Sequence, residues 1–286
     1  MCFVSDHSPL FKPLHRIFSL TSIICFSLML SCTGRYSSKM SVMVESPLIV
    51  AAYSSPYETA MNILTNFEGL LDSNTFHAIS EQFTVHLDPT KARKKIIASM
   101  NEDKNQEFLE KELRFWRSPL GIRLTETMEH LENMCEAEIQ ILLAQSSIPF
   151  SSLDSAAQER FLVIESSQNI GESDLFWIGL YKQIHIATYH IANSFLDHPF
   201  RFTEHEFQEQ LLNIERLYDF LIEMFGPMQY LYLLRNYSDE EFRYIFMHDN
   251  SEHSIWWSTT LRIAMESFVE EAIDSLYQEL DVEITM

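Results

Sequence analysis

The chain has 286 residues, a formal net charge of −21, and only 6 glycines and 9 prolines. The charge argues against nucleic acid as a partner, because neutralising phosphates requires clustered lysine and arginine side chains. Average usage would give roughly 20 glycines and 14 prolines, so few turns separate long elements, and no segment alternates as a strand does. The composition therefore predicts an all-α fold of helical hairpins stacked in a bundle.

The acidic residues are concentrated in the second part of the chain. From Leu124 onward there are 7 basic and 29 acidic residues, whereas the segment from Cys32 to Arg123 has 11 of each. An acidic surface of this kind suits basic partners, divalent cations or simple solubility.

Residues 1–31 have the organisation of an export signal, because Lys12 and Arg16 precede an apolar run that ends just before Cys32. The run is shorter than the roughly 20 apolar residues that a helix needs to cross a bilayer. Its end, LMLSC, resembles the lipobox of bacterial lipoproteins, which implies lipidation of Cys32 and attachment to the outer membrane from the periplasmic side. Ordinary signal cleavage and a retained signal anchor are the alternatives.

Residues 32–54 are predicted to form a tether, because they are rich in serine and lack a sustained period. Helical structure is expected from Ser55, where the sequence SPYE combines an N-cap, a first-position proline and a capping-box glutamate. A serine-rich stretch near residue 150 divides the remainder. We expect a helical subdomain at residues 55–146 and an acidic, aromatic-rich helical subdomain at residues 155–286.

Two periodic helices joined by a short turn occupy residues 103–142. Ser118 followed by Pro119 suits the N-cap and the first position of the second helix, since the serine oxygen accepts a free backbone N–H and proline has none to lose. Gly121 lies in the first turn, and the expected reason for a residue without a side chain there is close approach of the preceding helix. We therefore predict a tight helical hairpin.

The segment FWRSPLGIRL, with its SPxG core at Ser118, Pro119 and Gly121, resembles the bacterial family called domain of unknown function 2059. The resemblance covers residues 103–142. It implies a small, all-helical, exported envelope protein without an assigned activity, and it supplies no functional residues. A weaker echo at Tyr237 to Met265, which lacks the SPxG core, suggests two repeat-related halves.

Residues 175–196 are apolar on nearly every side, which predicts a helix in the middle of the bundle. Capping boxes, in which a serine or threonine precedes a glutamate by three residues, predict helix starts at Thr203 and Ser238. The last helix is expected at about residues 254–280.

The familiar sequence motifs of catalysis are absent. No glycine pair belongs to a GxGxxG or GxxxxGK phosphate loop, and HExxH, CxxC and GxSxG do not occur. We therefore predict no cofactor and no catalytic residue.

The best candidate for a metal site is the sequence HDNSEH, a turn between two helices. It carries His248, Asp249, Glu252 and His253, and imidazoles and carboxylates are ligands of zinc and other divalent ions. The spacing matches no named metal site. A polar, solvated turn is the alternative interpretation.

Together these patterns favour a periplasmic binding or interaction module held at the membrane by an N-terminal lipid or signal anchor. Its partner is expected to be a protein or an apolar small molecule, since the many aromatic residues of the second part could line a cleft. Ordinary core packing is the alternative reading of those aromatics. An envelope enzyme with a metal-dependent site, or a purely structural envelope protein, are the alternative functions.

Overall fold

In the computed structural model, every regular element of the described residues is helical, and no strand occurs among them. The described residues are 47–100, 106–132, 138, 140–141, 144, 148–197, 200–224 and 227–282. The all-α prediction is confirmed within these ranges. The predicted export signal, Cys32 and the first part of the predicted tether lie outside the described residues.

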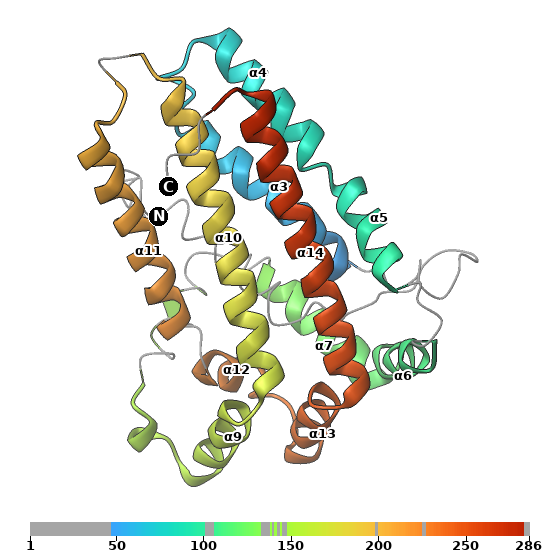
Figure 1. Cartoon of the computed structure of the whole chain (residues 1–286). Helices are drawn as coiled ribbons and strands as arrows, with labels where there is room; N and C mark the ends of the chain where they lie inside the picture. The colour runs from blue at the N-terminus through green and yellow to red at the C-terminus, as the bar shows by residue number, and fades with distance from the viewer. Residues whose placement is uncertain are drawn as a thin grey trace, which may run out of the picture.

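The helices follow one another with short connections. In chain order they are α3 (Pro47–Thr65), α4 (Ser73–His86), α5 (Pro89–Met100), α6 (Gln106–Trp116), α7 (Pro119–Glu132), the 3-10 turn η2 (Phe150–Ser152), α9 (Ser155–Glu165), α10 (Gln168–Ser194), α11 (Glu204–Met224), α12 (Pro227–Leu233), α13 (Asp239–Asp249) and α14 (Glu252–Glu279). The long helices α10, α11 and α14 run along the molecule, and the shorter α6, α9, α12 and α13 gather near one end (Figure 1).

One hydrophobic core runs through the described helices. Helix α10 packs against α3, α11 and α14, as its apolar pattern predicts, and α14 also packs against α4, α5 and α6. A single cluster of buried side chains extends from Ile49 in α3 to Leu276 in α14. The predicted subdomains at residues 55–146 and 155–286 therefore share this core.

Helix α3 begins at Pro47, eight residues before the predicted start at Ser55, so the last part of the predicted tether is helical. Burial of Ile49 and Ala52 favours this longer helix. Pro56 lies inside it and cannot donate to the carbonyl oxygen of Ala52. The Ser55 hydroxyl donates to that oxygen at 2.9 Å instead, which satisfies the group that Pro56 leaves unpaired. Tertiary packing thus outweighs the local start signal.

The predicted hairpin at Ser118 is present as the α6–α7 corner. The Gly121 N–H donates to the Ser118 side-chain oxygen at 3.1 Å, so Ser118 caps α7 as expected. A Cβ atom added at Gly121 would lie 2.4 Å from the Phe115 carbonyl oxygen and 2.8 Å from the Trp116 Cα. The predicted close approach of the preceding helix is confirmed. The described part of α7 ends at Glu132.

The predicted capping box at Ser238 is also formed. The Glu241 N–H donates to the Ser238 hydroxyl oxygen at 3.3 Å, and the Ser238 N–H donates to the Glu241 carboxylate at 2.9 Å. Ser238→Ala is expected to lower the free energy of unfolding by about 1 kcal/mol in urea titrations, because one helix N–H loses its partner. Ser238→Gly, the matched control, should cost only about 0.3 kcal/mol. Equal losses in the two variants would contradict a capping role.

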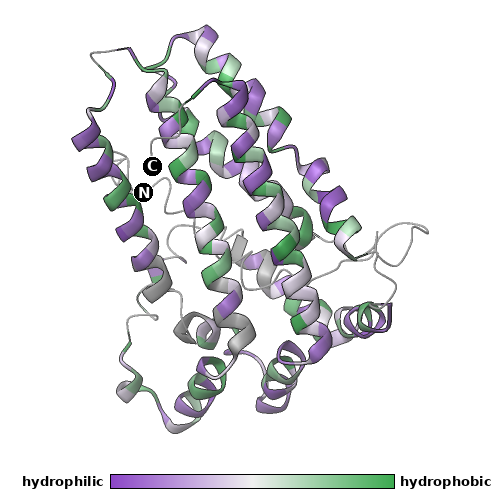
Figure 2. Cartoon of the chain, viewed as in Figure 1, coloured by the Kyte–Doolittle hydropathy of each residue, from purple (hydrophilic) through white to green (hydrophobic). Residues whose placement is uncertain are grey.

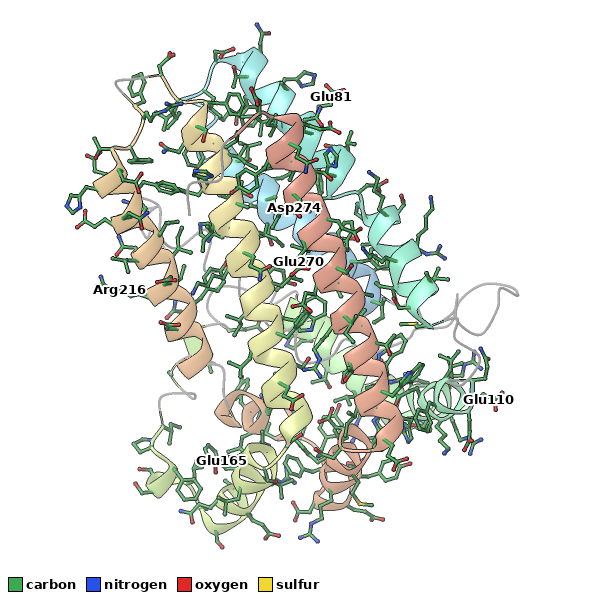
Figure 3. The ribbon with its side chains drawn as sticks, viewed as in Figure 1. Glu81, Glu110, Glu165, Arg216, Glu270 and Asp274 are labelled. Atoms are coloured by element: carbon green, nitrogen blue, oxygen red, sulfur yellow. The ribbon has the colours of Figure 1, made fainter. Side chains whose placement is uncertain are left out.

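Hydrophilic residues line the outward faces of peripheral helices such as α5 and α11 (Figure 2). Carboxylates such as Glu81, Glu110 and Glu165 lie at the outer surface and are exposed (Figure 3). Glu112 is different, because its relative exposure is 0%. Among the acidic residues whose side chains the structure describes, it is the only buried one, and it marks the candidate site.

Candidate functional site

Glu112 lies on the inner face of α6, although its neighbours Glu110 and Lys111 are exposed. It follows the buried Leu109 by three residues and precedes the buried Trp116 by four, so the helix places all three on one face. The Trp116 indole N–H donates to Oε2 of Glu112 at 3.0 Å. This bond fixes the carboxylate and leaves its other oxygen, Oε1, directed at the neighbouring helices.

Two imidazoles from the α13–α14 corner meet that oxygen. The Nδ1 atom of His253 lies 2.6 Å from Oε1 of Glu112, within a hydrogen bond that the carboxylate accepts. The Nε2 atom of His248 lies 3.3 Å from the same oxygen, but it has no partner with hydrogen-bond geometry. We call Glu112, His248 and His253 the polar corner.

The α13–α14 corner brings the two histidines together. His248 is in the last turn of α13, and Ser251 caps the next helix by accepting the Ser254 N–H. This short connection places the ring centroids of His248 and His253 at 5.3 Å. The histidine side chains are 7% and 20% exposed, so the polar corner is buried on the His248 side and reaches solvent at His253.

Aromatic rings of α6 hold the His248 imidazole in place. The Phe115 ring stacks on it with centroids 3.5 Å apart and an interplanar angle of 9°. The Trp116 ring meets it edge-on at 5.5 Å. Packing of this kind restricts ring rotation, so His248 presents Nε2 to Glu112 in a fixed direction.

The charge state of Glu112 follows from its surroundings. Burial alone would raise the pKa of Glu112, but the contacts with His248 and His253 outweigh it and hold that pKa below its usual value. The carboxylate is therefore ionised despite its burial. An ionised oxygen beside two imidazole nitrogens is a set of groups that can bind a cation.

The other two residues of the predicted metal turn point elsewhere. Asp249 accepts a hydrogen bond from the Ser167 hydroxyl at 3.0 Å, between α9 and α10. Glu252 is exposed in the first turn of α14. The structure thus groups His248 and His253 with Glu112, each offering one ligand atom, and these atoms lie within 4.8 Å of one another.

Sequence reasoning missed Glu112 because it precedes His253 by 141 residues. One local signal was present, since Glu112 interrupts the apolar face that Leu109 and Trp116 define on α6. A carboxylate at such a position needs a buried partner. The partners of Glu112 are His248 and His253, which reach it only because α13 and α14 pack near α6 in the folded protein.

The crowded aromatic residues of the second part are largely core residues. Trp177, Tyr181, Tyr218 and Tyr230 are buried in the shared hydrophobic cluster. A hollow of about 260 Å³ lies between α7 and α12. It is lined by Arg123, Glu126, Thr127, His130, Leu233, Arg235, Asn236 and Tyr237. Arg123 is paired there with Glu241 at 2.6 Å. Core packing accounts for the four aromatic residues without an apolar ligand.

His185 of α10 faces the core, where its Nδ1 atom lies 3.5 Å from the Tyr218 hydroxyl. Burial lowers the pKa of His185 from 6.5 to about 4. The unfolded chain therefore binds a proton more readily, so stability is complete above pH 6.5 and falls toward pH 4. At pH 5 the loss is about 2 kcal/mol. Unfolding free energies of wild type and His185→Leu at pH 5 and 8 should reveal this difference, and parallel pH profiles would contradict it.

No family model matches the chain, and no curated protein or solved structure matches it either. No helix among the described residues is long and apolar enough to span a membrane. The resemblance of residues 103–142 to domain of unknown function 2059 stays a prediction. Function is therefore inferred from the geometry of the polar corner.

Proposed function

We propose that the protein is a binding module of the bacterial cell envelope, and that its ligand binds at the polar corner. One observation carries the proposal. The carboxyl group of Glu112 is fully buried beside His248 and His253 where three helices meet.

Stability alone gives little reason for this arrangement. Desolvation of a buried charge costs several kcal/mol, and apolar residues of similar volume are often equally stable or more stable. Buried ionisable groups whose pKa is perturbed by their surroundings are correspondingly common at functional sites. The polar corner fits that pattern.

The surroundings of the polar corner suit contact with a ligand from solvent. Tyr244 and Met247 of α13 are exposed, Met247 to 72%. The Tyr244 ring packs on Phe115 with centroids 6.0 Å apart, and Phe115 in turn stacks on His248. Exposed apolar side chains therefore stand next to the buried polar groups, a combination typical of binding sites.

The envelope location rests on the sequence of residues 1–32. Intact-mass measurement of the native protein after membrane fractionation tests it. We expect a chain that starts at Cys32 with a diacyl or triacyl modification, in the outer-membrane fraction. An unmodified chain in the cytosolic fraction would overturn the envelope part of the proposal.

The binding role is tested by making the polar corner apolar. In the triple variant Glu112→Met, His248→Leu, His253→Leu, the Trp116 N–H loses its acceptor at a cost of about 1 kcal/mol. Relief of the buried charge offsets this, so the free energy of unfolding should stay within about 1 kcal/mol of wild type or rise. A loss above about 3 kcal/mol would show that the polar corner is structural.

A further inference from the structure

We infer that the ligand of the polar corner is a divalent transition-metal ion of the zinc class, bound by Glu112 Oε1, His248 Nε2 and His253 Nδ1. The inference rests on the proposed binding role and names the ligand for it. The three atoms lie within 4.8 Å of one another and come from three helices, α6, α13 and α14.

The two distances measured from Glu112 Oε1 are close to those of a tetrahedral site. Zinc bonds to nitrogen and oxygen are about 2.0–2.1 Å long, so neighbouring ligand atoms of a tetrahedron are about 3.3 Å apart. Glu112 Oε1 and His248 Nε2 are already 3.3 Å apart. His253 Nδ1 is at 2.6 Å from the same oxygen and must retreat by about 0.7 Å. It is the most exposed of the three and sits in the first turn of α14, where such a shift is feasible.

The Nε2 atom of His248 points to the same conclusion, because its contact with Glu112 lacks hydrogen-bond geometry. Its side chain is only 7% exposed, and Nε2 has no hydrogen-bond partner although a carboxylate oxygen is 3.3 Å away. Buried imidazole nitrogens are normally paired. An ion between the ligands would accept lone pairs from His248 Nε2 and His253 Nδ1, and the Nδ1 proton that His253 donates to Glu112 would move to its own Nε2 or be released to solvent.

Neighbouring groups orient the ligands in the way that metal sites require. The Trp116 N–H occupies Oε2 of Glu112, which leaves Oε1 as the single coordinating oxygen. Phe115 stacking fixes the His248 ring. Hydrogen bonds and packing around a metal site commonly set ligand direction and raise metal affinity about 10–100-fold. In the polar corner, the hydrogen bond from Trp116 and the packing of Phe115 are both in place before an ion binds.

The ligand set decides the class of ion. Two imidazole nitrogens and one carboxylate oxygen suit zinc and neighbouring transition metals, whereas calcium and magnesium take mainly oxygen ligands in larger number. Three protein ligands leave one tetrahedral position for water. The site would therefore bind Zn²⁺ or Co²⁺ in preference to Mg²⁺ or Ca²⁺.

The test uses the full mature protein, freed of metal by chelation, with ZnCl₂ and CoCl₂ as probes. Equilibrium dialysis should give one ion per chain, and bound Co²⁺ should show the intense visible absorption of tetrahedral coordination. Glu112→Gln, His248→Leu and His253→Leu should each weaken binding by about 100-fold or more. Asp249→Asn and Glu252→Gln, the matched controls in the same turn, should change affinity by less than about threefold.

Several outcomes would overturn the assignment. The first is that folded wild-type protein binds neither Zn²⁺ nor Co²⁺. The second is that Glu112→Gln binds them as tightly as wild type does. The third is that the Asp249→Asn or Glu252→Gln control loses affinity. Circular dichroism of each variant establishes that it is folded. If the ion does not bind while the apolar triple variant keeps its stability, only the metal assignment fails. If the triple variant unfolds, the proposed binding role fails as well.

Discussion

Trp116→Ala is expected to lower the free energy of unfolding by about 4 kcal/mol, because it removes a large side chain that is 1% exposed in the core. The same change removes the N–H that donates to Oε2 of Glu112 and the ring that packs edge-on against His248. Urea denaturation with linear extrapolation measures the loss. A change below about 2 kcal/mol would show that the α6 face is less tightly packed than the structure indicates.

Trp116→Phe separates packing from hydrogen bonding. Phenylalanine keeps most of the buried ring but leaves Oε2 of a buried carboxylate without its donor, which adds a penalty of about 1–3 kcal/mol. Trp177→Phe is the matched control, since Trp177 is also fully buried while its indole nitrogen has no hydrogen-bond partner. We expect the Trp116 variant to be the less stable of the two and to bind Co²⁺ about 10–100-fold more weakly than wild type. Equal stability and unchanged Co²⁺ affinity would contradict an orienting role for Trp116.

Local rules explain what the sequence predicts well. Ser118 and Ser238 act as caps because a side-chain oxygen reaches a free N–H within three residues, and no distant contact is needed. Likewise, the reason for Gly121 lies five or six residues earlier, in the backbone of Phe115 and Trp116. Features of this range are readable in a single sequence.

Long-range packing explains what the sequence leaves open. The start of α3 moves to Pro47 because Ile49 and Ala52 find buried positions that no local signal reveals. In the predicted metal turn, adjacency in sequence suggested Asp249 as a ligand, but helix direction turns it toward Ser167. The carboxylate that does meet His248 comes from α6. The packing of the helical hairpins against one another decides which side chains converge. A hydrophobic pattern indicates which face of a helix is buried, but it does not indicate which other helix packs against that face.

Gly121→Ala is the second large effect that we expect, and it connects the hairpin with the polar corner. The new Cβ would lie 2.4 Å from the Phe115 carbonyl oxygen, and because the obstacle is backbone, no side-chain rotation can relieve the clash. The α6–α7 corner must open. We expect a loss of about 3 kcal/mol in the free energy of unfolding, even though alanine favours a helix over glycine by about 1 kcal/mol.

Gly179→Ala is the matched control for this steric argument. Gly179 lies inside α10, and a Cβ added there meets no atom within 4 Å, so the variant should be neutral or more stable by about 0.5–1 kcal/mol. Opening the α6–α7 corner displaces Phe115 and Trp116, which hold His248 and Glu112. Gly121→Ala should therefore also weaken Co²⁺ binding, while Gly179→Ala leaves it unchanged. If both alanines were tolerated equally, the close contact at Gly121 would not exist in solution, and the α6–α7 corner would not be what positions the Glu112 carboxylate.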